Sequence, residues 1–335
     1  MVMKSRLLTF QSRPTILSTA VTAGPLEKQS VFHSSFDVIY DDERTNLKTN
    51  EQGNAQLIED TCLLAVRKAG LEIADIDVLL SGDLVNQMTP TNFAARELAV
   101  PFMGMFSACA TSVSSLITGS VLIESNLVEN VLFGSSSQHN AVERQFRYPI
   151  EYGAQKPPTG QWTVTAGGFG VLSHSKNNLP YVHSATIGQV VDCECTDPLD
   201  MGSAMAPAAF DTIQTHLNEN GNDVPYDLIM TGDLGKTGFA ILQELMKKSG
   251  LNSYPVKVYR DAGAEFYGNK SEFRSGASGA GCSASVYFGP IYSDLLAKKI
   301  KKVLLVATGA LLSPLSFQQG ETIPCIAHAV ELCID

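Results

Sequence analysis

The sequence has no apolar run that approaches the roughly 18–20 residues required by a membrane-spanning helix. Its first ten residues, MVMKSRLLTF, are followed by the polar QSRP, so the apolar stretch of a secretory signal is also missing. Basic residues are scarce: 24 Lys and Arg stand against 34 Asp and Glu, which gives a net charge of −10. Nucleic-acid binding requires a concentrated basic face, so we expect no nucleic-acid partner. Because no membrane span or secretory signal is recognisable, we also expect a soluble chain. An anionic small molecule is expected to bind only where a few arginines gather.

Cysteine and histidine are few, and their spacing suits neither a disulfide framework nor a metal site. Seven cysteines are spread over 335 residues, and this odd, thinly spread set does not suggest a disulfide framework. Cys193 and Cys195 form a C-x-C pair without a second pair at metal-binding spacing, and the six histidines form no H-x-x-x-H pair. We therefore expect no metal site and a reducing compartment for synthesis.

The sequence does contain ample material for a buried core. Apolar residues make up 44% and charged residues 17% of the chain, a balance that excludes a disordered or coiled-coil protein. At roughly 150 residues per domain, this length predicts two domains or halves.

Three short sequence matches recur in the same order in both halves. DVLLSGDL at 77–84 resembles DLIMTGDL at 227–234, at an offset of 150 (227 − 77). ACATSV at 108–113 resembles GCSASV at 281–286, and VLFG at 131–134 resembles LLVA at 304–307, both at an offset of 173 (281 − 108 and 304 − 131). Each match is weak alone, but the shared order predicts two copies of one α/β unit.

The two copies predict the same order of elements. Strands are expected from apolar runs at residues 76–80, 102–106, 128–133, 227–230, 256–259 and 302–307. Helices are expected at residues 51–69, 107–125 and 238–248, and from about residue 278. Strands that alternate with helices favour a mostly parallel sheet covered on both faces. Two such halves, residues 1–175 and 176–335, are expected to pack as a five-layer α-β-α-β-α sandwich.

Cys109 has the setting of a site residue. It follows an apolar strand run and opens a helix of small residues, where the positive end of the helix dipole would lower the thiol pKa and favour the thiolate. The alternative is a buried structural cysteine, which is the more common fate of a free cysteine. We apply that alternative to Cys282, the repeat counterpart of Cys109.

A cysteine at the start of a helix in a duplicated βα unit resembles the thiolase superfamily, which includes the ketoacyl synthases. In that superfamily the cysteine accepts an acyl group, and a His/His or His/Asn pair from the second half activates it. Here the corresponding turns read TGDLGKTG at 231–238 and FRSGASGAGCSAS at 273–285, without those residues. A cysteine without a base and an oxyanion-stabilising donor is a poor acyl-transfer catalyst, so we lean towards a chain that is not an enzyme.

The whole chain more closely resembles the stage V sporulation protein AD family. The resemblance is carried by the segments GDLVNQ (82–87), ERQFRYPIEYG (143–153), TDPLDMGSAMAPAAFDTI (196–213), GDLGKTG (232–238), SGASGAGCSA (275–284), VATGALLSP (306–314) and QQGETIPCIAHAV (318–330). It implies a thiolase-like fold, a homodimer and a peripheral location at the forespore or spore inner membrane. It also implies binding of dipicolinic acid (pyridine-2,6-dicarboxylate), for uptake into the developing spore together with other stage V sporulation A membrane proteins.

The residues around Cys109 contain groups that suit such a ligand. A planar dianion requires forked donors and a flat apolar wall, which Arg144, Arg147 and Tyr148 would supply. His139 lies at the carboxyl end of the 128–133 strand, where α/β sheets place ligands. The alternatives are surface ion pairs for the two arginines and a hydrogen-bonded structural role for His139.

Three more candidates lie further along the chain. Asp192, with Asp197 and Asp200, either caps a helix or completes the oxygen shell of a calcium ion that enters with the ligand. Lys236 offers an anion contact, although its Gly-Lys-Thr is not a P-loop, and His328 is a weaker candidate. No cofactor is expected.

Three hypotheses on function stand beside one another. The first is a non-catalytic thiolase relative that binds dipicolinic acid, and the second is an acyltransferase with Cys109 as nucleophile and His139 or Asp233 as an unusual base. The third is a structural scaffold for spore-membrane partners. The homodimer is expected to form through the 128–133 strand, which would otherwise be an exposed apolar edge.

Overall fold

A computed structural model describes residues 5–145, 156–221 and 225–335. Within these ranges the chain forms one long sheet and a separate two-stranded pair. The strands are β1 Leu7–Thr9, β2 Thr15–Ala23, β3 Val38–Ile39, β4 Val78–Gly82, β5 Phe102–Gly104, β6 Asn130–Ser137, β7 Trp162–Thr163, β8 Ala166–Ser173, β9 Tyr181–Thr186, β10 Leu228–Thr231, β11 Tyr259–Asp261, β12 Ala277–Ser278, β13 Lys302–Ala310 and β14 Cys325–Cys333. The helices are α1 Asn50–Lys68, α2 Thr89–Leu98, α3 Thr111–Glu124, α4 His139–Glu143, α5 Met201–Asn220, α6 Gly235–Ser249, α7 Ala262–Glu265, α8 Ala280–Val286, α9 Tyr292–Leu296 and α10 Pro314–Gln318.

Ten of the twelve strands of the long sheet form two groups of five with the same connectivity, while β1 pairs with β9 and β3 pairs with β2. The first group has the order β2-β8-β6-β4-β5, and the second has the order β9-β14-β13-β10-β11. Each group therefore places its first, fifth, fourth, second and third strand side by side. Strands β2 and β9 join the groups through one register pair, Thr15 opposite Tyr181. The three sequence matches fall on β4 and β10, on the starts of α3 and α8, and on β6 and β13, which confirms the predicted duplication.

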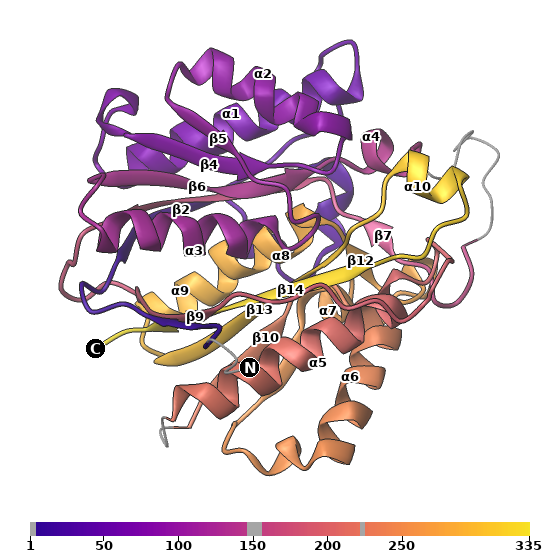
Figure 1. Ribbon diagram of the computed structural model, residues 1–335. Coiled ribbons are helices and arrows are strands. Elements are labelled where there is room, and N and C mark those ends of the chain that lie inside the picture. The colour runs from indigo at the N-terminus through magenta and orange to yellow at the C-terminus, as the bar shows by residue number, and fades with distance from the viewer. Residues whose placement is uncertain (1–4, 146–155, 222–224) are drawn as a thin grey trace.

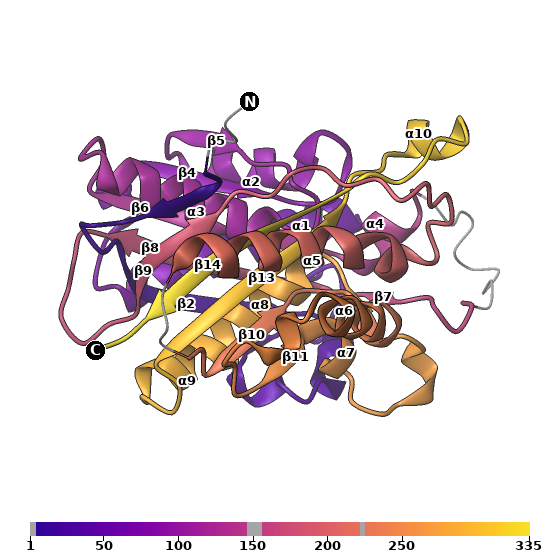
Figure 2. The ribbon, with the colours of Figure 1, turned by 60° about the horizontal axis from the view of Figure 1, so that its bottom comes forward.

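The elements stack as five layers, as the sequence predicts. In Figure 1, helices α1 and α2 cover the outer face of the first strand group, and α3 and α8 lie between the two groups. Helices α5 and α6 cover the outer face of the second group, and Figure 2 shows α5 lying across β13 and β14. The chain thus has the α-β-α-β-α arrangement of the thiolase fold.

The central helices approach closely because their facing residues are small. The Ser112 hydroxyl of α3 lies 3.2 Å from the Ser283 hydroxyl of α8, and the Ser283 hydroxyl also contacts the Cys109 carbonyl at 3.2 Å. At Gly281 a Cβ would lie 2.3 Å from the Ala166 carbonyl oxygen, so a larger residue would push α8 away from β8. The start of each central helix is therefore fixed against the other half of the molecule.

Two sequence-based expectations about strands are wrong. Strand β6 lies between β4 and β8, so it is not a sheet edge, and its apolar residues are buried on both faces. The edge of the first group is β5, where Met103 is 53% exposed. Strand β11 begins at Tyr259 and not at residue 256, because Val256 forms only an isolated bridge with Tyr226.

Across residues 5–145, 156–221 and 225–335, no helix combines the length and the apolar character that crossing a bilayer requires.

Candidate functional site

Cys109 lies in a tight turn between β5 and α3, two residues before the helix begins at Thr111. Ala108 has a φ of 48°, a left-handed conformation that is unfavourable for a residue with a side chain. The Thr111 hydroxyl donates to the Ala108 carbonyl at 2.7 Å and accepts from the Ser107 N–H at 3.1 Å. Opposite the turn, a Cβ on Gly309 of β13 would lie 2.3 Å from the Ser107 carbonyl oxygen, so only glycine fits there. The turn is thus held by both halves of the chain.

A buried carboxyl group from the second half lies beside the Cys109 thiol. Asp233 follows β10 and is fully buried. Its oxygens accept hydrogen bonds from the Gly279 N–H at 2.9 Å and from the Thr308 hydroxyl at 2.8 Å. The charge of the same carboxyl also acts on the Cys109 thiol. Asp233 therefore joins the turn before α8 to β13 beside Cys109.

This environment keeps the thiol protonated. Burial raises the pKa of Cys109 well above its usual value, and the charge of Asp233 raises it further. Burial also raises the pKa of Asp233 to about 7. The sequence-based expectation of a lowered thiol pKa is wrong, because the thiol is buried and faces the Asp233 carboxyl, and both raise its pKa.

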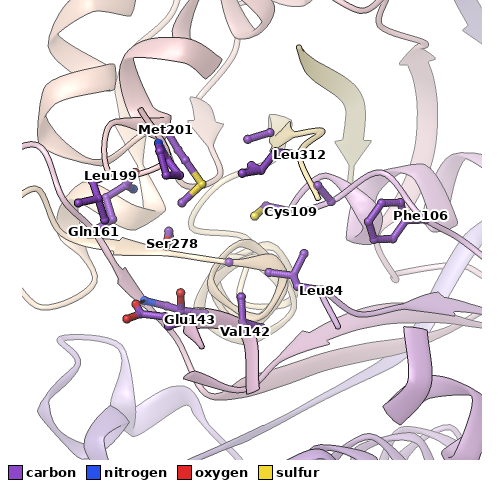
Figure 3. Close-up of a pocket in the computed structure, with 15 residues that line it drawn as sticks. Leu84, Phe106, Cys109, Val142, Glu143, Gln161, Leu199, Met201, Ser278 and Leu312 are labelled. Atoms are coloured by element: carbon purple, nitrogen blue, oxygen red, sulfur yellow. Dashed lines mark hydrogen bonds between the residues drawn. The ribbon is translucent and has the colours of Figure 1, made fainter. Parts of the chain in front are cut away.

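A pocket of about 810 Å³, counted out to open solvent, lies beside Cys109. In Figure 3 the sulfur atoms of Cys109 and Met201 point into the same space, with Phe106 on one side and Gln161 and Glu143 on the opposite side. The walls are mostly apolar. We call this space the Cys109 pocket; it is lined by Leu84, Phe106, Ala108, Cys109, Val142, Glu143, Gln161, Thr163, Pro198, Leu199, Met201, Ser278, Gly279, Ala310 and Leu312.

Glu143 brings a negative charge to the polar end of the pocket, and its neighbours balance that charge. Its Oε1 accepts hydrogen bonds from Lys156 Nζ at 2.9 Å and from the Thr163 N–H at 3.2 Å. Its Oε2 lies 3.6 Å from Nε2 of His139, whose ring stacks on Trp162 with centroids 4.2 Å apart. These groups form a buried polar cluster directly behind the pocket wall.

The structure brings only some of the predicted site residues to this pocket. Cys109 lines it, and His139 lies behind Glu143. Arg144 is exposed and forms an ion pair with Glu51 on α1, as a surface residue would. Arg147 and Tyr148 lie outside the described residues.

The acidic loop before α5 lies at the surface. Asp192 is exposed and accepts a hydrogen bond from the Thr322 hydroxyl at 2.6 Å. Asp200 caps α5, since its carboxylate accepts from the Ser203 hydroxyl at 2.7 Å and the Ser203 N–H at 3.4 Å. Among the residues that the structure describes, no three His, Cys, Asp or Glu side chains are arranged to hold a metal ion.

Lys236 and His328 do not line the Cys109 pocket either. Lys236 is exposed in the first turn of α6, and its N–H donates to the Ser275 carbonyl at 2.7 Å. His328 is buried in β14, where its Nδ1 accepts from the Gly188 N–H at 3.1 Å and burial lowers its pKa to about 4. A role for either residue in binding stays a prediction.

Sequence reasoning missed several residues that form the pocket, among them Gln161, Leu199 and Met201. Leu199 lies in the acidic segment 192–200 and Met201 directly follows it. In this segment only the aspartates were considered as candidate ligands from the sequence. Gln161 had one recognisable signal, since it is an amide directly before Trp162, the single tryptophan of the chain.

Comparison with known sequences gives close relatives. A family model described as Stage V sporulation protein AD matches residues 4–333. The Stage V sporulation protein AD of Bacillus subtilis is 45% identical over 317 residues, which cover 93% of this chain and 92% of the relative.

Comparison with solved structures gives the fold. AbyA1, a tetronic acid condensing enzyme, is 15% identical with a TM-score of 0.59 and covers 95% of this chain and 99% of its own. A variant of OleA from Xanthomonas campestris is 12% identical with a TM-score of 0.57, covering 97% and 100%. The 3-oxoacyl-(acyl carrier protein) synthase III, FabH, from Xanthomonas oryzae is 14% identical with a TM-score of 0.56, also covering 97% and 100%. At these identities the likeness shows a common fold alone.

Proposed function

Because the chain belongs to the stage V sporulation protein AD family, we propose that it binds dipicolinic acid without transforming it, for uptake into the developing spore. The Cys109 pocket is the proposed binding site. Membrane proteins of the same sporulation stage are the proposed partners, and the inner membrane of the forespore is the proposed location.

The burial of Cys109 beside the Asp233 carboxyl is the observation that most supports binding without chemistry. An acyl-transfer cysteine requires a base that takes its proton, whereas burial and the charge of Asp233 both raise the pKa of this thiol and keep it neutral. No histidine lines the pocket within the described ranges. Within the described residues the pocket therefore holds a cysteine without a histidine that would activate it.

The walls of the pocket suit a small planar ring. Phe106 offers a flat aromatic face, Leu199 and Leu312 add apolar contact area, and Thr163 and Ser278 are hydroxyl-bearing residues of the lining. A pyridine ring with two carboxylates would place its ring against the apolar side and its polar groups near these hydroxyls.

A calorimetric titration of the parent protein with dipicolinate tests the proposal. We expect one ligand per chain with a Kd in the micromolar range, about −8 kcal/mol. Benzoate, which has one carboxylate on a similar ring, is the control and should bind at least about tenfold more weakly. Parallel titrations with calcium chloride show whether the chelate binds as well. Absence of saturable heat up to about 1 mM dipicolinate would overturn the proposal.

Incubation with acetyl-coenzyme A should leave Cys109 unmodified. Each missing activating group typically lowers the rate by about 10²–10⁴-fold, so acylation should be near background. Intact-mass spectrometry and peptide mapping measure the modification, and alkylation of the exposed Cys193 by iodoacetamide shows that thiols in the sample are reduced. Rapid, stoichiometric acylation of Cys109 would instead favour the acyltransferase hypothesis.

We further propose that the chain is a homodimer that pairs through β5. This strand ends the first group, and next to its unpaired edge Met103 and Phe106 are 53% and 54% exposed. Light scattering should give about twice the chain mass of 36.0 kDa. Met103→Glu should shift the mass towards one chain, because the symmetry would bring like charges together, whereas Leu296→Glu on α9 should not. A single-chain mass for the parent at micromolar concentration would contradict the dimer.

A further inference from the structure

The side-chain amide of Gln161 has a fixed orientation. Its Nε2 donates two hydrogen bonds of 2.7 Å each, to the carbonyl oxygens of Asp233 and Ala277. Turning the amide over would place Oε1 against both carbonyls, where no hydrogen bond can form. Oε1 is therefore the atom that remains available to a ligand.

This oxygen is a buried acceptor without a donor. Gln161 is 7% exposed and lines the Cys109 pocket, and its Oε1 has no hydrogen-bond partner within the part of the chain that the structure describes. Buried polar atoms in proteins nearly always have a partner, because leaving water without one is unfavourable. A ligand that brings an O–H or N–H group to this point would complete the site.

The charges around the pocket favour the same kind of ligand. The lining contributes the Glu143 carboxylate and the Cys109 thiol, and within the described residues it includes no lysine or arginine. Lys156 and His139 reach Glu143 from behind the wall, and Asp233 faces Cys109. A dianion would therefore face the Glu143 carboxylate and the acceptor oxygen of Gln161, both of which repel negative charge. A proton on one carboxyl group of the ligand would reduce this repulsion and supply the donor that Gln161 lacks.

We propose that Gln161 determines specificity by accepting a hydrogen bond from the ligand, and that dipicolinate is bound as its singly protonated form. The dianion takes one proton from solvent on binding, and the new carboxyl O–H donates to Gln161 Oε1. No covalent bond to the protein forms or breaks. This inference rests on the proposed binding of dipicolinate in the Cys109 pocket.

Calorimetric titration of the parent protein in two buffers of different ionisation enthalpy measures the proton. We expect close to one proton taken up per dipicolinate bound, and an apparent association constant that falls about tenfold per pH unit between pH 6.5 and 8.5. Tight binding without proton uptake would overturn the inference and leave the proposed function standing. Absence of binding at every pH would overturn both.

A second ligand separates the proton of the ligand from protons of the protein. Pyridine-2,6-dicarboxamide carries N–H donors without taking up a proton, so its binding should release or absorb none and should not change with pH. If its binding also takes up one proton, a protein group such as Asp233 or His139 is titrating, and the inference is wrong.

Gln161→Met provides the matching variant, since methionine is similar in length and lacks the acceptor. We expect at least tenfold weaker dipicolinate binding, whereas Gln189→Met at an exposed position should bind like the parent. Thermal unfolding shows whether the variant is folded, because it also loses the donor to Asp233 and Ala277. A folded Gln161→Met protein with parental affinity would contradict the proposal. If this variant does not fold, the titration of the parent protein with the dicarboxamide tests the proposal instead.

Discussion

Cys109→Phe should weaken dipicolinate binding by at least about a hundredfold, which corresponds to roughly 3 kcal/mol. The Cys109 sulfur points into the pocket opposite Met201, so a phenyl ring at this position would fill the space proposed for the ligand ring. The turn cannot move aside to make room, because Gly309 and Thr111 hold it from two directions. Calorimetric titration measures the loss.

Two variants control for other effects of this substitution. Cys109→Ala removes the sulfur without filling the pocket and should cause a much smaller loss than Cys109→Phe. The same phenylalanine at the exposed Cys193 should leave binding as in the parent. Circular dichroism and thermal unfolding show whether Cys109→Phe is folded, and parental affinity in a folded variant would place the ligand elsewhere.

Raising the pH from 6 to 8.5 should lower the free energy of unfolding by roughly 2–4 kcal/mol. Burial raises the pKa of Glu27 to about 8, of Asp233 to about 7, and of Asp83 and Asp261 to about 6. A carboxyl with a raised pKa holds its proton more tightly in the folded than in the unfolded chain. Its contribution to stability is therefore complete below about pH 4 and is lost as the pH rises through the folded pKa.

Glu331 acts in the opposite direction at low pH. Although burial favours its protonated form, hydrogen bonds from His216 and Tyr226 and the charge of Lys302 lower its pKa to about 2. Its contribution is present above about pH 4.5 and is lost as the pH falls towards 2. Since the contributions of the four carboxyls with raised pKa already decline above the unfolded pKa of about 4, stability should be greatest near pH 4.5.

Urea denaturation at pH 6, 7 and 8.5 measures how the free energy of unfolding changes with pH. Glu27→Gln tests the carboxyl group that should contribute most to this change. Oε1 of Glu27 accepts hydrogen bonds from the Thr165 N–H and the Tyr267 hydroxyl, both at 3.1 Å, and a glutamine oxygen can accept them as well. The variant should lose less stability than the parent above pH 7. A parent whose free energy of unfolding is constant or rises from pH 6 to 8.5 would contradict this account.

The duplicated fold was predictable because its signals are local. The Gly-Asp-Leu at the ends of β4 and β10, and the small residues that open α3 and α8, recur in the same chain order in both copies. The position of β6 was not predictable in the same way, since an apolar run does not say which strands pair on either side. Its residues, buried on both faces, are typical of an interior strand.

The site was predictable only in part, because distant contacts decide its chemistry. The sequence indicates Cys109, but the state of its thiol depends on Asp233, which the fold brings from the other half. Gln161 becomes informative only when the carbonyls of Asp233 and Ala277 fix its amide. The pocket walls come from segments that share no motif, so periodicity could not group them.

Asp233 lies at the interface between the two copies of the repeat. The same carboxyl acts on the Cys109 thiol of the first copy and accepts hydrogen bonds from the Gly279 N–H and Thr308 hydroxyl of the second. A substitution of Asp233 that changed the environment of the thiol would also remove the acceptor that joins Gly279 to Thr308. The chemistry of Cys109 and the stability of the second copy therefore cannot be altered independently at this position.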